Sequence, residues 1–310
     1  MKIAIIGQQD FGKAVLEAFL ARGHEAAAVF CAPEKQGARP DALRVAAQGK
    51  GLRVHQFKSL RDPEAARAMR EAGTDIGIMA FVTQFAPQDF VKIPRLGTIQ
   101  FHPSLLPKHR GPSSINWPII QGDTETGLTI FRPTDGLDEG AVILQKRTPI
   151  GPDDTLGSVY FDRLFPMGVE AMLEAAELVL AGQHIETAQD ETQASYEGWC
   201  RSEEARIDWA KPVDQIYNLI RGCNPAPGAW TTANGKKLQI FDVRKNVFRR
   251  FADVAGKIGE INGVTAESFQ IIAQGGSIEV LKARLEDAKK VSGGELLQAA
   301  GIQAGAVLGV

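Results

Sequence analysis

The sequence has few cysteines and no long hydrophobic run. Its 310 residues include three cysteines, Cys31, Cys200 and Cys223, which lie far apart and form no C-x-x-C pair. This spacing excludes a disulfide framework and a zinc site, and it is typical of a protein in a reducing compartment. No stretch approaches the ~18 apolar residues of a membrane-spanning helix. The N-terminal MKIAIIGQQDFGK lacks the long apolar core and cleavage site of a signal peptide. We therefore expect a cytoplasmic protein without a membrane partner.

The chain also lacks a strong excess of either charge. It has 35 Lys and Arg against 37 Asp and Glu, a net charge of −2, which argues against a general nucleic-acid or membrane-surface binder. The balance is uneven, because residues 204–310 carry 14 basic and 11 acidic side chains, giving +3, and residues 1–203 carry −5. A basic cluster contributes to the C-terminal excess: Arg244, Lys245, Arg249 and Arg250. We expect this cluster to be a solvated turn rather than a phosphate-binding site.

Short β-branched runs alternate with amphipathic stretches over the first 180 residues. Strands are predicted at 3–6, 26–31, 53–57, 75–81, 97–101, 129–131 and 142–147. Helices are predicted at 11–21, 41–48, 63–72, 113–121 and 155–181. Ser113 or Ser114 would cap the fourth helix, and Pro166 would bend or split the fifth. The alternation predicts an α/β fold with a doubly wound, parallel, Rossmann-like sheet.

The pattern changes after a predicted helix at 213–221. Short strands punctuated by turn residues are predicted at 229–232, 237–243, 256–260, 268–272 and 278–283. Several short strands of this kind suggest a small β-barrel. Together with the chain length, this predicts a catalytic domain at residues 1–203 and a barrel domain at residues 204–310.

The first strand-to-helix turn, GQQDFGKA at residues 7–14, resembles two phosphate-binding motifs without matching either. Ala14 stands where a P-loop has the Ser or Thr that holds magnesium, and Gln9 stands where a dinucleotide-binding turn has its second glycine. A tight structural turn is the first interpretation of this segment. A helix N-terminus that faces an anionic group of a substrate is the alternative.

Two polar residues at predicted strand ends are candidates for proton transfer. His102 follows the strand at 97–101, and Asp138 lies in a glycine-flanked loop between two later strands. Each also has a purely structural interpretation, since a histidine can bond a backbone carbonyl and an aspartate can cap its own turn. Asp135 and Glu139 are rivals in the same loop, and His109 is expected in a solvated basic loop. No zinc-ligand spacing or G-x-S-x-G elbow is present.

Two strings carry a resemblance to a known family. HPSLLPKHRG, residues 102–111, followed by GLDEG, residues 136–140, resembles the folate-dependent formyltransferase family. In that family an Asn-x-His pair before S-L-L-P and an aspartate in a G-L-D-x-G loop form the active site. The further strings GQQDFGK, AFVTQFAP, SYEG and PGAW resemble the branch formed by the hydrolase domains of 10-formyltetrahydrofolate dehydrogenases. The resemblance covers most of residues 1–240 and implies a formyltransferase domain followed by an OB-like barrel.

Carried over by position, the resemblance implies that His102 and Asp138 are catalytic. Gln100 falls where formyltransferases have asparagine, so its amide is expected in the site on one extra methylene. The substrate implied is 10-formyltetrahydrofolate, with no metal. Folate-binding residues are expected in two loops and near the catalytic aspartate: Phe81, Val82, Gln84, Phe85, Ala86, Ser104, Leu105, Leu106, Pro107 and Asp135.

The implied reaction removes the formyl group from 10-formyltetrahydrofolate to water or to an acceptor. Transfer to methionyl-tRNA, transfer to a sugar nucleotide, and a folate-binding module with little activity of its own remain alternatives. A tRNA partner is not expected, because a net charge of +3 over residues 204–310 gives little support for it. If the chain is a fragment, the resemblance implies downstream carrier and aldehyde-dehydrogenase-like domains. The formyl acceptor and the oligomeric state are not readable from the sequence.

Overall fold

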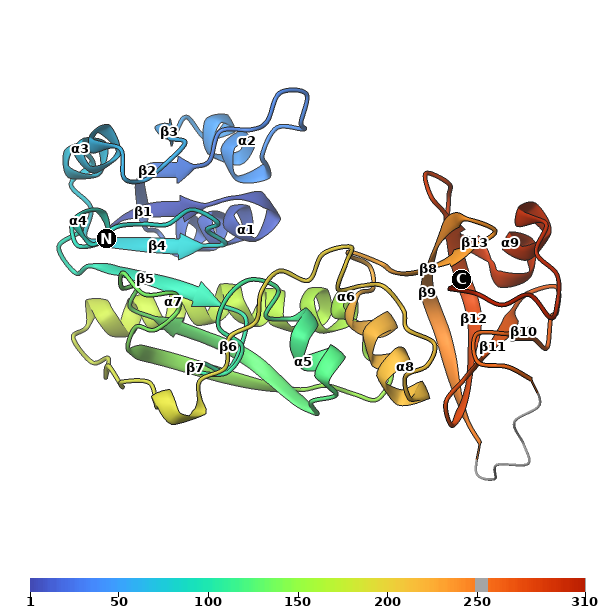
Figure 1. Cartoon of the computed structure of the whole chain (residues 1–310). Helices are drawn as coiled ribbons and strands as arrows, with labels where there is room; N and C mark the ends of the chain where they lie inside the picture. Colours follow the sequence, from blue (N-terminus) through green and yellow to red (C-terminus); the bar gives the residue numbers. More distant parts are fainter. Residues whose placement is uncertain (249–255, 310) are drawn as a thin grey trace. The chain divides into compact units, whose positions relative to one another are not determined.

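The computed structural model describes residues 1–248 and 256–309 (Figure 1). The chain forms two compact units that alternate along the sequence. The first comprises Met1–Gly111, Gly127–Thr148 and Phe161–Tyr196, and the second comprises Pro112–Thr126, Pro149–Tyr160 and Glu197–Val310. The boundary expected between residues 203 and 204 stays a prediction.

The first unit is built on a seven-stranded sheet with the order β3-β2-β1-β4-β5-β6-β7. Its strands are β1 (Lys2–Gly7), β2 (Glu25–Cys31), β3 (Val54–Gln56), β4 (Ile76–Ala80), β5 (Thr98–His102), β6 (Glu125–Phe131) and β7 (Val142–Pro149). The pairs that join β3 through β5 are parallel, and β6 is antiparallel to β5. Because the chain winds outward from β1 in both directions, the predicted doubly wound α/β fold is confirmed.

Helices cover both faces of this sheet. The core on one face includes residues of α1 (Gln9–Ala21), α2 (Ala42–Gly49) and α7 (Phe165–Leu180). The core on the other includes residues of α3 (Pro63–Ala72) and α4 (Gln88–Val91). Strand side chains alternate between faces, so Ile3 and Ile5 of β1 join the first core and Ala4 and Ile6 join the second. Burial on both faces explains the continuous apolar run of this strand.

The predicted helix at 113–121 is shorter, and its predicted cap is wrong. Helix α5 spans Asn116–Gln121, and Ile115 precedes it in a helical conformation without a side-chain cap. Ser113 contributes its carbonyl to the first helical N–H groups, while its hydroxyl accepts a hydrogen bond of 3.1 Å from the N–H of Cys200. The serine is therefore used for a contact distant in sequence rather than for capping.

The long helix predicted at 155–181 is divided into three segments. Helix α6 spans Leu156–Val159, a π-helical turn η1 follows at Tyr160–Leu164, and α7 completes the segment. Pro166 lies in the first turn of α7, where a missing N–H removes no internal helical bond. The proline therefore marks the start of a new helix.

The second unit contains an antiparallel sheet that curls into a half-barrel and confirms the predicted second β-domain. Its strands are β8 (Ala229–Ala233), β9 (Lys236–Val247), β10 (Ile261–Asn262), β11 (Phe269–Ala273), β12 (Gly276–Leu285) and β13 (Val291–Ser292). The order is β10-β11-β12-β9-β8, and β13 pairs with β12. Helices α8 (Val213–Gly222) and α9 (Gly293–Ala300) accompany this sheet, while the short 3-10 helix η2 (Glu191–Gln193) belongs to the first unit.

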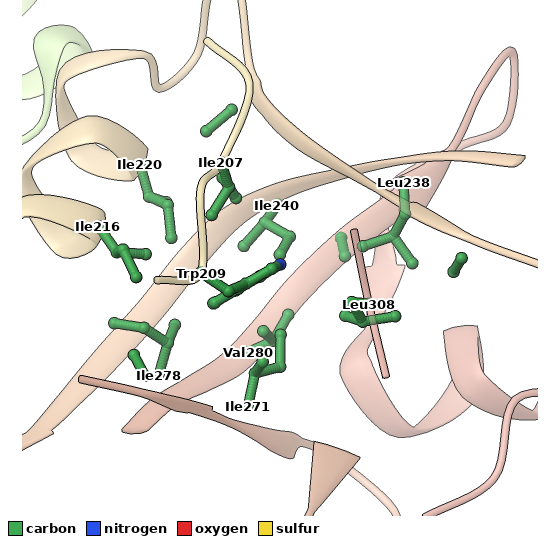
Figure 2. Packing of buried hydrophobic residues seen from close by; sticks show 14 of the residues in the cluster. Ile207, Trp209, Ile216, Ile220, Leu238, Ile240, Ile271, Ile278, Val280 and Leu308 are labelled. Atoms are coloured by element: carbon green, nitrogen blue, oxygen red, sulfur yellow. The ribbon is translucent and has the colours of Figure 1, made fainter. Parts of the chain in front are cut away.

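The core of the second unit is centred on Trp209. Figure 2 shows its indole ring among aliphatic side chains of β9, β11 and β12, including Ile240 and Val280. The ring is only 4% exposed, and its Nε1–H donates to the hydroxyl of Thr231 over 3.0 Å. A buried indole N–H needs such a partner, so burial of the ring leaves no polar group of the indole unsatisfied.

Three expectations for the C-terminal region need correction. Residues 256–260 form a turn region instead of the predicted strand, and strand β10 begins directly after them, at Ile261. Helix α9 was not anticipated. Arg244 and Lys245 lie within strand β9 rather than in a turn, and Lys245 pairs with Asp214. Arg249 and Arg250 lie outside the described residues. Among the helices of the described residues, none is long and apolar enough to cross a lipid bilayer.

Candidate active site

His102 is the last residue of β5 and lies at the carboxyl end of the strand. Its side chain is almost fully buried, and Nε2 is 2.8 Å from the carbonyl oxygen of His109. A carbonyl oxygen can only accept, so Nε2 carries a proton and donates it to this bond. The other ring nitrogen, Nδ1, faces Asp138 Oδ2 at 3.6 Å. The backbone bond therefore fixes which nitrogen is available for chemistry.

Asp138 follows β6, the antiparallel neighbour of β5, and is also buried. Its Oδ2 accepts a hydrogen bond of 2.9 Å from the N–H of Gly111. Its φ of 56° lies in the left-handed region, which costs a non-glycine residue on the order of 1–3 kcal/mol. The two predicted catalytic residues are thus brought together, and the aspartate is held in a backbone conformation that the surrounding structure must stabilise.

The two rival carboxylates do not occupy this position. Asp135 and Glu139 are both exposed, whereas Asp138 is buried against the histidine. The Glu139 carboxylate folds back over Gly136, where a Cβ atom would lie 1.9 Å from its Oε2. Asp138 is therefore the carboxylate of this loop that can act together with His102.

Gln100 lies two residues before His102 and so projects from the same face of β5. It is partly buried and aligns with Met79 of β4 and Phe131 of β6. Within residues 1–248 and 256–309, its side-chain amide makes no hydrogen bond. An uncommitted amide on the face that carries the histidine is available to a ligand.

The S-L-L-P turn is held by its own hydrogen bonds. The buried hydroxyl of Ser104 donates to the carbonyl of Lys108 over 2.7 Å. Thr129 donates to the carbonyl of Ser104 over 2.7 Å and accepts from the N–H of Leu106 over 3.1 Å. Leu105 is half-buried, and the Leu106–Pro107 peptide bond is cis. The hydroxyl of Ser104 is thus used inside the turn. Leu106 is buried as well, and the partly exposed side chains of Leu105 and Pro107 form the apolar surface of the turn.

The loop after β4 exposes two aromatic rings at the edge where β4 and β5 end side by side (Figure 1). Phe81 is 40% exposed with a φ of 58°, and Phe85 is 43% exposed with the Arg61 guanidinium 4.5 Å above its ring. Between them, Gln84 donates to the carbonyl of Phe57 over 2.8 Å. Exposed aromatic rings on an anchored loop are suited to a flat ligand.

The remaining predicted binding residues differ in their exposure. Ala86 is buried and Val82 is partly buried against the same hydrophobic core. Asp135 is exposed to solvent at the start of the aspartate loop.

The turn after β1 is tight for a steric reason. A Cβ atom on Gly7 would lie 2.0 Å from the carbonyl oxygen of Ala80, so only glycine allows this approach of β1 to β4. The N–H of Gln9, at the start of α1, donates to Asp41 Oδ2 over 2.8 Å. One of the donors that could have met a substrate anion is therefore occupied by a carboxylate of the chain itself.

The basic segment Lys108–Arg110 was expected in a solvated loop, and for two of its three residues this expectation is wrong. Lys108 is exposed, but His109 and Arg110 are 7% and 6% exposed. Hydrogen bonds to Glu191 raise the pKa of Arg110 above its ordinary value. Arg110 also bonds Gln189, which in turn contacts the backbone of the aspartate loop. No motif or hydrophobic periodicity marks Gln189, which lies in a polar stretch of the sequence.

No group of three or more His, Cys, Asp or Glu side chains that could hold a metal ion occurs in the described part of the chain. The candidate site residues described above are an imidazole, a carboxylate, an amide and the aromatic rings of one loop.

Comparison with known families matches both units of this chain. Residues 1–176 match the formyl transferase family, and residues 200–301 match the formyl transferase C-terminal domain. The chain therefore belongs to the formyl transferase family, a class consistent with the doubly wound fold and the His102–Asp138 pair.

Curated relatives fall into two kinds. The chain is 41% identical over 251 residues to the cytosolic 10-formyltetrahydrofolate dehydrogenase of Mus musculus, which covers 79% of this chain and 28% of that protein. It spans about a quarter of the length of the dehydrogenases that it matches. It is also 33% identical to the methionyl-tRNA formyltransferase of Geotalea daltonii, over 100% of this chain and 98% of that one.

Solved structures share the fold at lower identity. The structure of HypX from Aquifex aeolicus in complex with tetrahydrofolic acid has a TM-score of 0.67 and 21% identity, covering 96% of this chain and 47% of HypX. An N-formyltransferase from Helicobacter canadensis, in complex with folinic acid and dTDP-3-aminofucose, has a TM-score of 0.69 and 19% identity, covering 91% and 99%. At this identity the similarity supports the fold alone.

Proposed function

We propose that this protein removes the formyl group from 10-formyltetrahydrofolate, transferring it to water or to an acceptor. The observation that carries the proposal is the buried pair of His102 and Asp138, with Nδ1 and Oδ2 3.6 Å apart, beside the uncommitted amide of Gln100. The roughly 40% identity to 10-formyltetrahydrofolate dehydrogenases favours the same substrate. A reducing, cytoplasmic compartment is part of the proposal, and it agrees with three free cysteines.

The proposed reaction is nucleophilic attack on the formyl carbon. Attack by water or an amine gives a tetrahedral oxyanion, which needs hydrogen-bond donors in a site shielded from water. Since Nε2 of His102 is committed to the His109 carbonyl, Nδ1 is the atom that faces the chemistry. In the doubly protonated ring, in which both nitrogens carry a proton, Nδ1 would donate to this oxygen and then give its proton to the departing N10. Asp138 would accept the proton of the nucleophile, and Gln100 would add a second donor. Groups of this kind contribute on the order of 10²–10⁴ in rate.

The folate itself would lie along the loop after β4. Phe81 and Phe85 offer exposed rings, and the loop residues Val82, Gln84 and Ala86 would shape the pterin pocket together with backbone groups. On the other side, the S-L-L-P turn would supply apolar wall from Leu105, Leu106 and Pro107. We place Ser104 behind this wall and Asp135 at its rim.

The direct test is formate release from 10-formyltetrahydrofolate by matched variants. His102→Ala and Asp138→Ala should bind the folate but release no formate, because each loses a proton-transfer group and keeps the folate loop. Glu139→Ala is the control, since this exposed neighbour of Asp138 does not face the histidine. Near-normal turnover in either active-site variant would show that the assignment is wrong.

Methionyl-tRNA formyltransfer is the second candidate, because that relative matches this chain over its whole length. The match to the dehydrogenases covers about 79% of this chain. The same assay separates the two candidates when methionyl-tRNA is added. Formate release without an acceptor supports the hydrolase. Formation of tetrahydrofolate that requires charged tRNA, with the formyl group recovered on the methionyl amine instead of as formate and with steep weakening by salt, supports the tRNA enzyme.

A third possible outcome of the assay is that the chain binds the folate without turning it over. This outcome is considered because the chain spans only about a quarter of the length of the dehydrogenases that it matches. Folate binding without turnover would support a module that passes the formyl group to carrier and aldehyde-dehydrogenase-like domains. The 26–28% coverage of those relatives is the reason to include this outcome.

A further inference from the structure

The segment 109–111 supplies the backbone groups that orient both members of the His102–Asp138 pair. The carbonyl of His109 accepts from His102, and the N–H of Gly111 donates to Asp138. Arg110, the residue between them, points its side chain into the protein and is 6% exposed. Whatever holds Arg110 in place therefore also sets the geometry of the pair.

The Arg110 guanidinium is bound by two side chains from residues 189–191. Its Nη1 and Nη2 donate to the two carboxylate oxygens of Glu191 over 2.9 and 2.7 Å. Its Nε and Nη2 donate to Oε1 of Gln189 over 3.2 and 2.8 Å. Because a guanidinium can only donate, the atom of Gln189 that faces it must be the carbonyl oxygen. The orientation of the Gln189 amide is thereby determined.

The NH₂ group of Gln189 is then directed at the aspartate loop. Nε2 donates to the carbonyl oxygens of Asp138 and Gly140, each over 2.8 Å. One of these carbonyls belongs to Asp138, which has a left-handed φ of 56°, and the other belongs to Gly140, two residues later in the same loop. The double hydrogen bond therefore stabilises a backbone conformation that an aspartate would otherwise leave.

From this arrangement we propose that Gln189 is a positioning residue for Asp138. Its amide bonds both Arg110 and the backbone of the aspartate loop, so the loop is held in a fixed position relative to Arg110. This holds the Asp138 carboxylate between Gly111 and His102. Gln189 touches neither the pair's side chains nor, on this proposal, the folate. The inference rests on the proposed function for its kinetic consequence, but its geometric consequence is independent of any activity.

The test compares Gln189→Glu, Gln189→Ala and Gln193→Ala. A glutamate can still accept the hydrogen bonds of Arg110 but cannot donate to the carbonyls of Asp138 and Gly140. Gln189→Glu therefore removes the two bonds to the aspartate loop and keeps the bond to Arg110. Gln193 is the control, because it is exposed and, among the residues that the structure describes, its side chain donates only to Asp190. Thermal unfolding of each variant checks that the fold is retained.

Two readouts are measured. Both Gln189 variants should lower kcat for formate release on the order of 10²-fold, as expected when a reacting group moves by about 1 Å, with KM for the folate unchanged. The amide of Gly111 should lose its protection from hydrogen exchange, measured by NMR, since its acceptor moves away. Gln193→Ala should change neither quantity.

The outcomes separate the inference from the proposed function. If Gln189→Glu keeps the wild-type kcat, or if Gly111 stays protected in both Gln189 variants, Gln189 does not position Asp138. If Gly111 loses protection but the unmodified protein releases no formate under any condition, the proposed hydrolase activity fails and the positioning role stands.

Discussion

At the scale of single residues, Gln100 is the proposed site residue at which the chain departs from the formyltransferase motif that it resembles. On that resemblance Gln100 falls at the position of an asparagine, and its amide makes no hydrogen bond to any described residue. The same functional group is offered on a side chain longer by one methylene. Substitutions at this position therefore test whether the rate depends on the presence of the amide or on the length of the side chain that carries it.

Replacing Gln100 by leucine should lower kcat by about 10²–10³, the effect of removing one donor to an oxyanion. Gln100→Asn should lose much less, because it keeps the amide. Steady-state formation of tetrahydrofolate, which both hydrolysis and formyl transfer produce, measures both variants with and without an amine acceptor. Equal activity of the leucine variant and the wild type would exclude the amide from oxyanion stabilisation.

At the scale of secondary-structure elements, close approach of strands depends on glycine. Gly7 ends β1 beneath the carbonyl of Ala80. At Gly49, the last residue of α2, a Cβ would have no atom within 4 Å among the described residues outside its own chain neighbours and helix backbone. The two positions therefore form a matched pair for measuring the steric requirement of the first turn.

Gly7→Ala should lower the free energy of unfolding by about 3 kcal/mol, because the new methyl group forces β1 away from β4. Gly49→Ala should leave it unchanged or raise it by up to about 1 kcal/mol, since alanine is the better helix former. Urea denaturation of both variants gives the comparison. A Gly7→Ala protein as stable as Gly49→Ala would contradict the tight packing described for this turn.

The loop between β2 and α2 gives the fold a dependence on pH. The backbone N–H of Asp41 and the amide of Gln56 lower the pKa of Glu34 from 4.5 to about 2, and Arg44 also binds this carboxylate. A carboxylate with a depressed pKa stabilises the folded state above its unfolded pKa, and the contribution is lost as the pH falls towards the folded pKa.

Glu34→Gln should therefore be less stable than the wild type at pH 7. The difference between the two proteins should shrink between about pH 4.5 and pH 2, because the wild-type carboxylate becomes protonated in that window. Thermal unfolding of both proteins across this range measures it. A difference that stays constant with pH would show that the charge of Glu34 is not responsible.

At the scale of the whole molecule, the periodicity of the sequence was sufficient to predict the architecture. It was insufficient to predict the contacts between segments that lie far apart in the sequence. The alternating burial of β1 follows from its residues alone. Helix α9 was missed because it begins with Gly293 and Gly294, which usually disfavour helices. Their Cβ atoms would lie 2.3 Å from the carbonyl of Val280 and 2.2 Å from that of Ala266, so packing requires glycine there.

The candidate site shows the same division. His102 and Asp138 could be predicted, because strand ends and family motifs mark them. Gln189 and the burial of Arg110 could not, since their roles arise from hydrogen bonds between segments about 80 residues apart.

The stability of the second unit should depend strongly on Trp209, which lies at the centre of its core. Trp209→Ala should lower the free energy of unfolding of this unit by about 3–5 kcal/mol through the cavity it leaves. Trp209→Phe should lower it less, although it leaves the Thr231 hydroxyl without its indole partner. Chemical denaturation followed by circular dichroism checks the order of the three proteins, and equal midpoints would show that the ring does not anchor the core.

The membership of α5 in the second unit has a practical consequence for making fragments. Asn116 of α5 donates to the carbonyls of Gly222 and Ala226, and Trp117 and Ile120 pack against the core of that unit. A truncated protein ending near residue 203 would retain α5 and lose α8 and the core of the second unit, on which this helix packs. Its apolar side chains would then face water, and such a fragment should be prone to aggregation even with every proposed catalytic residue present. A recombinant protein meant for assays needs the C-terminal third for solubility, whatever that third does in the reaction.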